Sequence, residues 1–279
     1  MKIKIISDLH IDINRGVLEV SQFGFINEIL SNDIDILLIA GDTSGSYHDT
    51  TKFMVGLQEF IEENNLKTKV FFTIGNHEPY SYDTDDKSIQ DINTGLSNMF
   101  NNNPVKFLQN EHIVIDDYVI FGGTLYTDFN LNGDIYFGEF MANKYINDFR
   151  YCATRDRDGI VKAVKPHEYT GWFNKCVSEL QKVCETHKDK KIVVFTHFGV
   201  SANSISEKYV NSYVNSFYVS TLEDFIKRNN NICLWAHGHV HDSFNYTIGD
   251  TKVLVKPYGY YGHETQVLPE KYFGVNIEV

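Results

Sequence analysis

Six of the eleven histidines in this 279-residue chain lie where a short apolar run, typical of a β-strand, comes to an end. Two aspartates and one asparagine occupy similar positions. Imidazole together with carboxylate suits Mn, Fe, Zn, Co or Ni better than Ca or Mg. Nine candidate side chains exceed what one ion requires, so their number favours a site for two ions. The nine are Asp8, His10, Asp42, Asn76, His77, His197, His237, His239 and His241.

Spacing along the chain supports a shared site. Residues i and i+2 of an extended segment point to the same side, so Asp8 and His10 can present two ligands together, and so can His239 and His241. Asp42 follows a glycine, where the chain can turn sharply and direct a carboxylate at two ions. Two-metal hydrolases hold their ions about 3.5–4 Å apart. Two divalent cations would outweigh the charge of the two aspartates, and the pocket would then attract a phosphate.

The elements that position these residues indicate an α/β fold. Apolar runs at 2–7, 34–40 and 70–74 alternate with amphipathic segments at 17–30, 49–64 and 88–100. This order predicts parallel strands joined by right-handed crossovers. Ligand sites in such sheets lie beyond the carboxyl ends of the strands. All three runs end in a polar cluster, which is where we expect the site.

The following segments contain closely spaced strands. Strands are expected at 105–108, 112–115, 118–123, 191–196, 232–236 and 273–277, with a hairpin over 243–255. The pairs Asn110-Glu111 and Asp116-Asp117 are typical of hairpin turns. These strands predict a second sheet within the same domain.

Two helices and one irregular segment complete the expected organisation. A long helix is expected at 166–187, and the capping-box pattern of Ser220 and Glu223 predicts a helix that continues to residue 229. Residues 124–165 lack clean periodicity. We interpret 124–165 as an insert or lid with some helix, within a single domain over 1–279.

Composition limits the class of partner. Hydrophobic residues make up 42% of the chain, too many for a disordered protein. The net charge of −12 disfavours nucleic acid and anionic membrane surfaces as partners. The apolar run at 36–40 is far too short to span a membrane, no signal peptide is recognisable, and the four cysteines form no CxxC pair. We therefore expect a cytoplasmic protein with reduced thiols and no membrane partner.

Five short motifs resemble those of the calcineurin-like metallophosphoesterases, in the order usual for that family. They are Asp8-x-His10, Gly41-Asp42, Gly75-Asn76-His77-Glu78, Thr196-His197 and Gly238-His239-x-His241. Residues 123–126 and 257–260 are more weakly similar to segments of small bacterial or phage-type members. The resemblance implies two packed mixed β-sheets flanked by helices, a four-layer αββα sandwich.

The resemblance also implies roles for the matching residues. Asp8, His10, Asp42 and His241 would hold one ion, while Asp42, Asn76, His197 and His239 would hold the second. The cofactors would be two divalent transition-metal ions, with Mn first and Fe, Zn, Ni or Co as alternatives. A hydroxide bridging the ions would attack phosphorus in line, and His77 would act near the leaving group as general acid or charge stabiliser. His237 shares the parity of His239 and remains open as a ligand or a supporting residue.

Departures from the family pattern narrow the expected substrate. Phosphoprotein phosphatases carry G-D-x-V-D-R-G and R-G-N-H-E, whereas this chain has Thr43 and Ser44 after the aspartate and Ile74 before the glycine, so those arginines are missing. The nearest tyrosine to Asp42 is Tyr47, which disfavours a ferric–tyrosinate site. We expect hydrolysis of a small phosphodiester, nucleotide or phosphomonoester. The alternatives are a metal-dependent nuclease acting on DNA or RNA ends and a non-catalytic scaffold.

Residues that would choose the substrate carry no motif. Three arginines in the insert could bind a second phosphate or only be solvated: Arg150, Arg155 and Arg157. Three tyrosines could stack on a nucleobase or pack a sheet edge: Tyr258, Tyr260 and Tyr261. His167 could contact substrate, although a surface position is the alternative.

Overall fold

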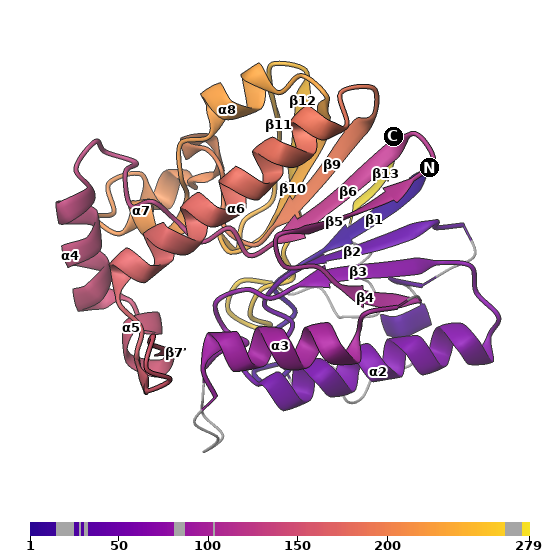
Figure 1. Cartoon of the computed structure of the whole chain (residues 1–279), viewed down its shortest axis with the longest axis horizontal. Helices are drawn as coiled ribbons and strands as arrows, with labels where there is room; N and C mark the ends of the chain where they lie inside the picture. Colours follow the sequence, from indigo (N-terminus) through magenta and orange to yellow (C-terminus); the bar gives the residue numbers. More distant parts are fainter. Residues whose placement is uncertain (15–24, 28, 31–32, 81–86, 103, 266–274) are drawn as a thin grey trace.

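Two β-sheets pack face to face at the centre of the protein (Figure 1). The computed structural model describes residues 1–14, 25–27, 29–30, 33–80, 87–102, 104–265 and 275–279. The first sheet has the strand order β13-β1-β2-β3-β4. The second sheet has the order β11-β12-β10-β9-β6-β5.

The first sheet is parallel except at one edge. Its parallel strands are β1 (Lys2–Ile6), β2 (Ile36–Ala40), β3 (Lys69–Thr73) and β4 (Val105–Phe107). The edge strand β13 (Val275–Glu278) pairs antiparallel with β1. The predicted parallel β-α-β order of the first hundred residues is confirmed for these strands.

The second sheet is mixed. Its strands are β5 (Glu111–Ile115), β6 (Tyr118–Gly123), β9 (Lys191–Thr196), β10 (Ile232–His237), β11 (Phe244–Ile248) and β12 (Thr251–Val255). Strands β6, β9, β10 and β12 run parallel to one another, whereas the edge strands β5 and β11 pair antiparallel with β6 and β12. The parallel strands of both sheets end at the same side of the molecule, where the candidate ligands follow them.

Helices cover the outer face of each sheet (Figure 1). Helices α2 (Tyr47–Glu63) and α3 (Ile89–Met99) pack on the first sheet, and α6 (Pro166–Thr186) and α8 (Glu223–Arg228) pack on the second. Every residue of β2 is apolar because both faces of this strand are buried, one against the other sheet and one against the helices. Leu38 packs between the sheets and Leu37 packs towards the helices. The predicted four-layer αββα sandwich is confirmed.

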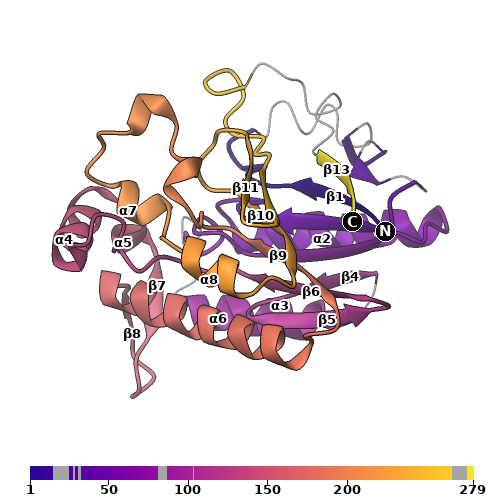
Figure 2. The same ribbon diagram turned by 90° about the horizontal axis from the view of Figure 1, so that it is seen from above.

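Short elements gather at the end of the molecule opposite the two termini (Figures 1 and 2). Residues 124–165 contribute α4 (Ile135–Tyr145), α5 (Asp148–Tyr151) and the hairpin of β7 (Ala153–Arg155) with β8 (Val161–Ala163). Helix α7 (Asn215–Tyr218) contacts α4. The single-domain organisation and the lid role of 124–165 stay predictions.

Two local predictions are wrong. Asn110-Glu111 is no hairpin turn, because β4 belongs to the first sheet and β5 to the second, and Asn110, with φ 58°, lies where the chain crosses between them. Ser220 does not cap α8. The hydroxyl of Ser220 donates to Thr127 Oγ1 instead, and α8 begins at Glu223 without a side-chain cap. The Asp116-Asp117 turn between β5 and β6 is confirmed.

Two predicted elements lie largely or partly outside the described residues. Of the helix expected at 17–30, residues 25–27 and 29 are helical in the described part. Of the strand expected at 273–277, the described part begins with β13 at residue 275. Among the described helices, none has the length and apolar character needed to cross a membrane. The cytoplasmic location stays a prediction.

Candidate metal centre

The loops that follow the parallel strands bring distant parts of the chain together. The backbone N–H of Asp8 donates to the carbonyl of Gly41 (3.1 Å), and that of His10 donates to the carbonyl of Asp42 (3.1 Å). The N–H of Gly238 donates to the carbonyl of His197 (3.0 Å). These bonds join the ends of β1 and β2 in the first sheet and of β9 and β10 in the second.

Five of the seven predicted ligands have left-handed backbone conformations. Asp8, His10, Asp42, His239 and His241 have φ between 44° and 70°. Non-glycine residues adopt this region at a cost, and such residues concentrate at functional sites. The argument from i and i+2 parity is therefore wrong for both motifs, because left-handed turns rather than extended backbone aim these side chains.

The predicted ligands form two clusters that share one residue. The first cluster consists of Asp8, His10, Asp42 and His241, and the second of Asp42, His197 and His239. Within each cluster, one potential ligand atom per residue lies within 4.8 Å of the others. The Oδ1 atom of Asn76 lies 3.0 Å from His197 Nε2, beside the second cluster. All seven residues named from the sequence are therefore together, and their role as ligands stays a prediction.

The Asp42 carboxylate lies between the two clusters. Its Oδ1 accepts a hydrogen bond from the backbone N–H of His77 (2.9 Å). Its Oδ2 is buried and has no hydrogen-bond partner in the described part of the chain. The Nε2 atoms of His197 and His10 lie 3.3 and 3.8 Å from this oxygen. A buried carboxylate oxygen that accepts no hydrogen bond is costly, and a bridging cation would satisfy it.

Ring nitrogens of the clusters also fit bound cations. Among the described residues, His239 Nε2 is buried without a hydrogen-bond partner. The Nε2 atoms of His10 and His241 are 3.0 Å apart. Two nitrogens that lie about 2.1 Å from one ion at a right angle are about 3.0 Å apart. The donor set of imidazole, carboxylate and amide suits a divalent transition metal.

Neighbouring groups fix the orientation of the candidate ligands. His197 Nδ1 lies 2.9 Å from the carbonyl oxygen of Ala40, and His241 Nδ1 lies 2.6 Å from Glu264 Oε2. Both contacts leave Nε2 facing the cluster, as metal-binding histidines require. Asp8 accepts hydrogen bonds from the Ser7 hydroxyl and from the backbone N–H of His239 (2.9 Å).

The segment after β12 supports the first cluster without supplying a ligand. The backbone N–H groups of Tyr258 and Gly259 donate to the carbonyls of Ser7 and Asp8, each at 2.9 Å. The Tyr260 ring packs on His10, with centroids 4.6 Å apart. Tyr260 therefore contacts a candidate ligand, and it also lines the pocket.

Glu78 forms hydrogen bonds with two of the loops that carry candidate ligands. This buried carboxylate accepts hydrogen bonds from the backbone N–H groups of Gly75 (2.7 Å), Thr43 (2.8 Å) and Asp42 (3.3 Å). Burial and the nearby charge of Asp42 raise the pKa of Glu78 to about 8. The glutamate of the Gly-Asn-His-Glu motif thus orients backbone rather than substrate.

Asp148 supports a candidate ligand, and the sequence did not indicate it. Its buried carboxylate accepts a hydrogen bond from Asn76 Nδ2 (3.0 Å), which leaves Asn76 Oδ1 to face the second cluster. The hydroxyl groups of Tyr80 and Tyr169 also donate to it, the latter at 2.9 Å. Asp148 belongs to the irregular segment 124–165, where no motif or periodicity marked it.

The protonation of the histidines divides them into two pairs. Burial lowers the pKa of His10 to about 3, and burial also lowers the pKa of His239. Burial alone would lower the pKa of His197 and His241 too, but Asp42 raises that of His197 to about 9 and Asp8, with Glu264, raises that of His241 to about 10. Without an ion, each cluster therefore holds one neutral and one protonated histidine at neutral pH.

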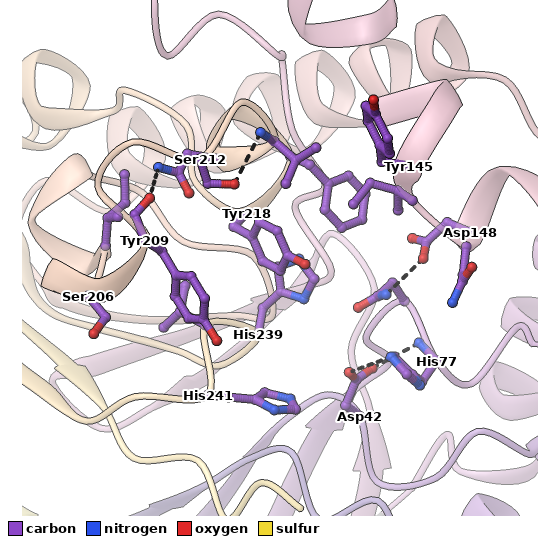
Figure 3. A pocket seen from close by; sticks show the side chains of 18 of the residues that line it. Asp42, His77, Tyr145, Asp148, Ser206, Tyr209, Ser212, Tyr218, His239 and His241 are labelled. Atoms are coloured by element: carbon purple, nitrogen blue, oxygen red, sulfur yellow. Dashed lines mark hydrogen bonds and ion pairs between the residues drawn. The ribbon is translucent and has the colours of Figure 1, made fainter. Parts of the chain in front are cut away.

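A cavity of about 420 Å³ opens from the clusters towards α4 and α7 (Figure 3). His77 lines it with a side chain that is 20% exposed, and its ring stacks on Tyr80 with centroids 4.4 Å apart. Among the described residues, Asp42, Asn76, His239 and His241 line the same cavity. A bound phosphoester could therefore contact the clusters and His77 together.

Other candidates from the sequence lie elsewhere. His237 is outside both clusters, because its ring nitrogens lie 2.9 Å from the carbonyl oxygen of Gly238 and from the Ser204 hydroxyl. Arg155 pairs with Asp91 at 2.6 Å, and Arg150 donates to the carbonyl of Lys144 at 2.8 Å. Neither arginine lines the cavity among the described residues.

Comparisons with known proteins agree with this geometry. A family model described as calcineurin-like phosphoesterase matches residues 1–243. The chain therefore belongs to the calcineurin-like phosphoesterase family. The prediction of a metal-dependent phosphoester hydrolase is confirmed by this membership. Membership of the family specifies neither the substrate nor the identity of the metal.

Similar proteins come from different sources. The uncharacterized protein L509 of Acanthamoeba polyphaga mimivirus is 22% identical over 284 residues, which cover 98% of this chain and 96% of that protein. The phosphopantetheinyl hydrolase PptH of Mycobacterium tuberculosis has a similar structure, with a TM-score of 0.66, 18% identity and coverage of 93% of this chain and 89% of that one. A dimetal phosphatase of Danio rerio has a TM-score of 0.50, 10% identity and coverage of 91% and 86%. These structural likenesses show the fold.

Proposed function

We propose that this protein hydrolyses a small phosphodiester, nucleotide or phosphomonoester at the two clusters, with two divalent transition-metal ions, Mn²⁺ first among them. The observation that supports this proposal most directly is the Asp42 carboxylate, because its buried Oδ2 lies between the clusters at the cavity and accepts no hydrogen bond among the described residues. Asp8, His10, Asp42 and His241 would hold one ion. Asp42, Asn76, His197 and His239 would hold the other.

The ions and the protein contribute different parts of the chemistry. When bound, two divalent cations neutralise charge on phosphoryl oxygens and lower the pKa of coordinated water. The protein holds the phosphate against the clusters through the shape of the cavity. His77 faces the cavity beside them and can give a proton to a leaving oxygen. Its position is fixed from both sides, by the bond from its N–H to Asp42 and by the stack on Tyr80.

A small substrate fits the cavity better than a polymer. No lysine or arginine lines it among the described residues, so the nuclease alternative lacks the cationic track that a nucleic-acid backbone requires. The arginines of phosphoprotein phosphatases are also missing from the motifs. The similarity to PptH, whose name describes hydrolysis at a phosphopantetheinyl group, is compatible with a phosphodiester substrate.

The test is hydrolysis of bis-p-nitrophenyl phosphate by purified protein loaded with Mn²⁺. We expect turnover, and we expect His77→Ala to lower kcat about 100-fold or more while two ions per chain remain bound. His167→Ala is the matched control, because this exposed histidine at the start of α6 does not line the cavity. Folded protein that hydrolyses nothing with Mn, Fe, Co, Ni or Zn would contradict the proposal.

A further inference from the structure

Two histidines away from the clusters form a separate pair. His112 lies on the edge strand β5, and His187 directly follows the last residue of α6 (Figure 2). Their Nε2 atoms are 3.3 Å apart, and the centroids of their rings are 5.2 Å apart. Among the described residues, this pair belongs to neither cluster and does not line the cavity. The proposed hydrolysis therefore does not use it.

Both separations fit a single tetrahedral ion. Two imidazole nitrogens that bind zinc at about 2.0–2.1 Å and at the tetrahedral angle are about 3.3 Å apart. Rings that both point at this ion have centroids about 5.2 Å apart. A straight N–H···N hydrogen bond of the same length would place the centroids about 5.6 Å apart. The observed distances therefore fit rings that converge on one point beside the line between the two nitrogens.

Hydrogen bonds hold the backbones that carry the two rings. The carbonyl of His187 accepts from the backbone N–H of Lys190 (3.1 Å) and from Asn231 Nδ2 (3.2 Å). Lys190 Nζ donates to the carbonyl of Asp116 (2.8 Å), in the turn between β5 and β6. The end of α6 is thus connected to the hairpin that carries His112. Ligands that are already held in place lose less conformational entropy when they bind an ion.

The pair is also accessible and chemically suited to a metal. His112 is exposed and His187 is half-buried, so an ion from solvent can reach both. Metal ions bind the neutral form of imidazole. Burial and the neighbouring His187 lower the pKa of His112, so protons compete less with a metal at this ring. Imidazole nitrogens suit Zn²⁺, whereas Mn²⁺ has the lowest affinity of its series for such sites.

We infer that His112 and His187 form a third metal site, which binds one Zn²⁺ ion through both imidazoles, with water completing the tetrahedron. The bound ion would join the edge strand β5 to the end of α6 across 75 residues of sequence. This site is separate from the two clusters and does not depend on the proposed hydrolysis. Because its remaining ligands are water, it exchanges its ion with solvent.

Isothermal titration calorimetry with Zn²⁺ counts the ions that the full chain binds. We expect His112→Ala and His187→Ala each to bind one zinc ion fewer than the unaltered chain, because either change leaves a single imidazole. His167→Ala is the matched control, since this exposed histidine lies at the other end of α6, and it should leave the count unchanged. With Mn²⁺ all four proteins should bind the same number of ions.

Two further measurements separate metal binding from a general effect on the fold. Zinc should raise the midpoint of thermal unfolding more in the unaltered chain than in His112→Ala, because only the folded chain brings both rings to one ion. Hydrolysis of bis-p-nitrophenyl phosphate by Mn²⁺-loaded His112→Ala should equal that of the unaltered chain. If His112→Ala does not fold, His187→Ala tests the same site.

The zinc counts distinguish the third site from the proposed function. Three ions that fall to two in both variants support both. One ion that falls to none supports the third site and contradicts two-ion binding at the clusters. Two ions in every protein overturn the third site and leave the proposed function standing. The third site is also overturned if His167→Ala lowers the count as much as the other two changes.

Discussion

The two clusters share Asp42 but differ in how they are enclosed. All members of the second cluster are buried, and Asn76 beside it is fixed by the buried carboxylate of Asp148. In the first cluster the side chain of His241 is 16% exposed, and its partner Glu264 is 30% exposed. Supporting groups that are shielded from water act more strongly than exposed ones. We therefore expect the second cluster to hold its ion more tightly and the first to exchange its ion with solvent.

Substitution of the shared carboxylate should have the largest effect, because it touches both clusters. Asp42→Asn removes the charge that would bridge the ions, so both should be lost and kcat/KM should fall at least about a thousandfold. Metal analysis of the purified variant and turnover of bis-p-nitrophenyl phosphate measure this. Asp12→Asn is the control, because Asp12 accepts a backbone hydrogen bond from Gly45 (2.8 Å) nearby and belongs to neither cluster. A variant that retains both ions would contradict the bridging role.

Asp148→Asn should separate the clusters. The new amide cannot accept every hydrogen bond that the carboxylate receives, so Asn76 should lose its fixed orientation. We expect the affinity for the ion at the second cluster to fall about 10- to 100-fold, as is usual when a group that orients a ligand is removed. Calorimetric titration with Mn²⁺ resolves the two binding events, and circular dichroism verifies folding.

Two further variants sharpen this comparison. Tyr169→Phe removes one of the donors to Asp148 and should lower the affinity for the ion at the second cluster by a smaller factor. Glu264→Gln is the matched change at the first cluster. Because Glu264 is partly exposed, we expect this change to lower the affinity for the ion at the first cluster less than tenfold. Equal loss of both ions in Asp148→Asn, or a larger effect of Glu264→Gln, would refute the proposed difference between the clusters.

The pH dependence of metal binding should be similar for both clusters. In the metal-free protein the pKa of His197 is about 9 and that of His241 about 10, so at pH 7 both carry a proton that an ion must displace. Affinity should therefore rise with pH, by about tenfold per pH unit for each proton released, until those values are reached. His10, with a pKa of about 3, is already neutral and releases none.

Titrations in buffers of different ionisation enthalpy count the released protons. About one proton per ion is expected at pH 7. Affinity that stays constant between pH 6 and 8 would exclude protonated histidines in the metal-free clusters. Release from one cluster only would identify which of His197 and His241 is neutral without an ion.

The sequence predicted the candidate ligands better than the residues that surround and support them. Polar residues after buried apolar strands are recognisable because parallel strands end together, and this argument brought seven residues to the correct edge. The reason offered for Asp8 and His10 was nevertheless wrong, since their side chains converge through left-handed backbone rather than strand parity. Such conformations depend on tertiary hydrogen bonds that a local pattern does not contain.

Supporting residues were missed for a related reason. Asp148 and Glu264 act through contacts with residues far away along the chain, namely Asn76 and His241. Neither lies in a periodic segment or a motif. The prediction of a hairpin turn at Asn110 was wrong for a similar reason. The packing of the whole core determines whether the strand after Asn110 pairs in the same sheet or crosses to the other one. Sequence alone therefore located the candidate ligands but not the residues that support them.

The bonds from Tyr258 and Gly259 to Ser7 and Asp8 have a consequence for synthesis of the protein. A nascent chain that has left the ribosome only as far as residue 243 already contains every candidate ligand. It still lacks the backbone donors that hold the loop after β1, and it lacks the strand that pairs with β1 at the sheet edge. We therefore expect the loop after β1 to take up its final conformation only once residues 258–278 have been synthesised, so that metal is bound after that point.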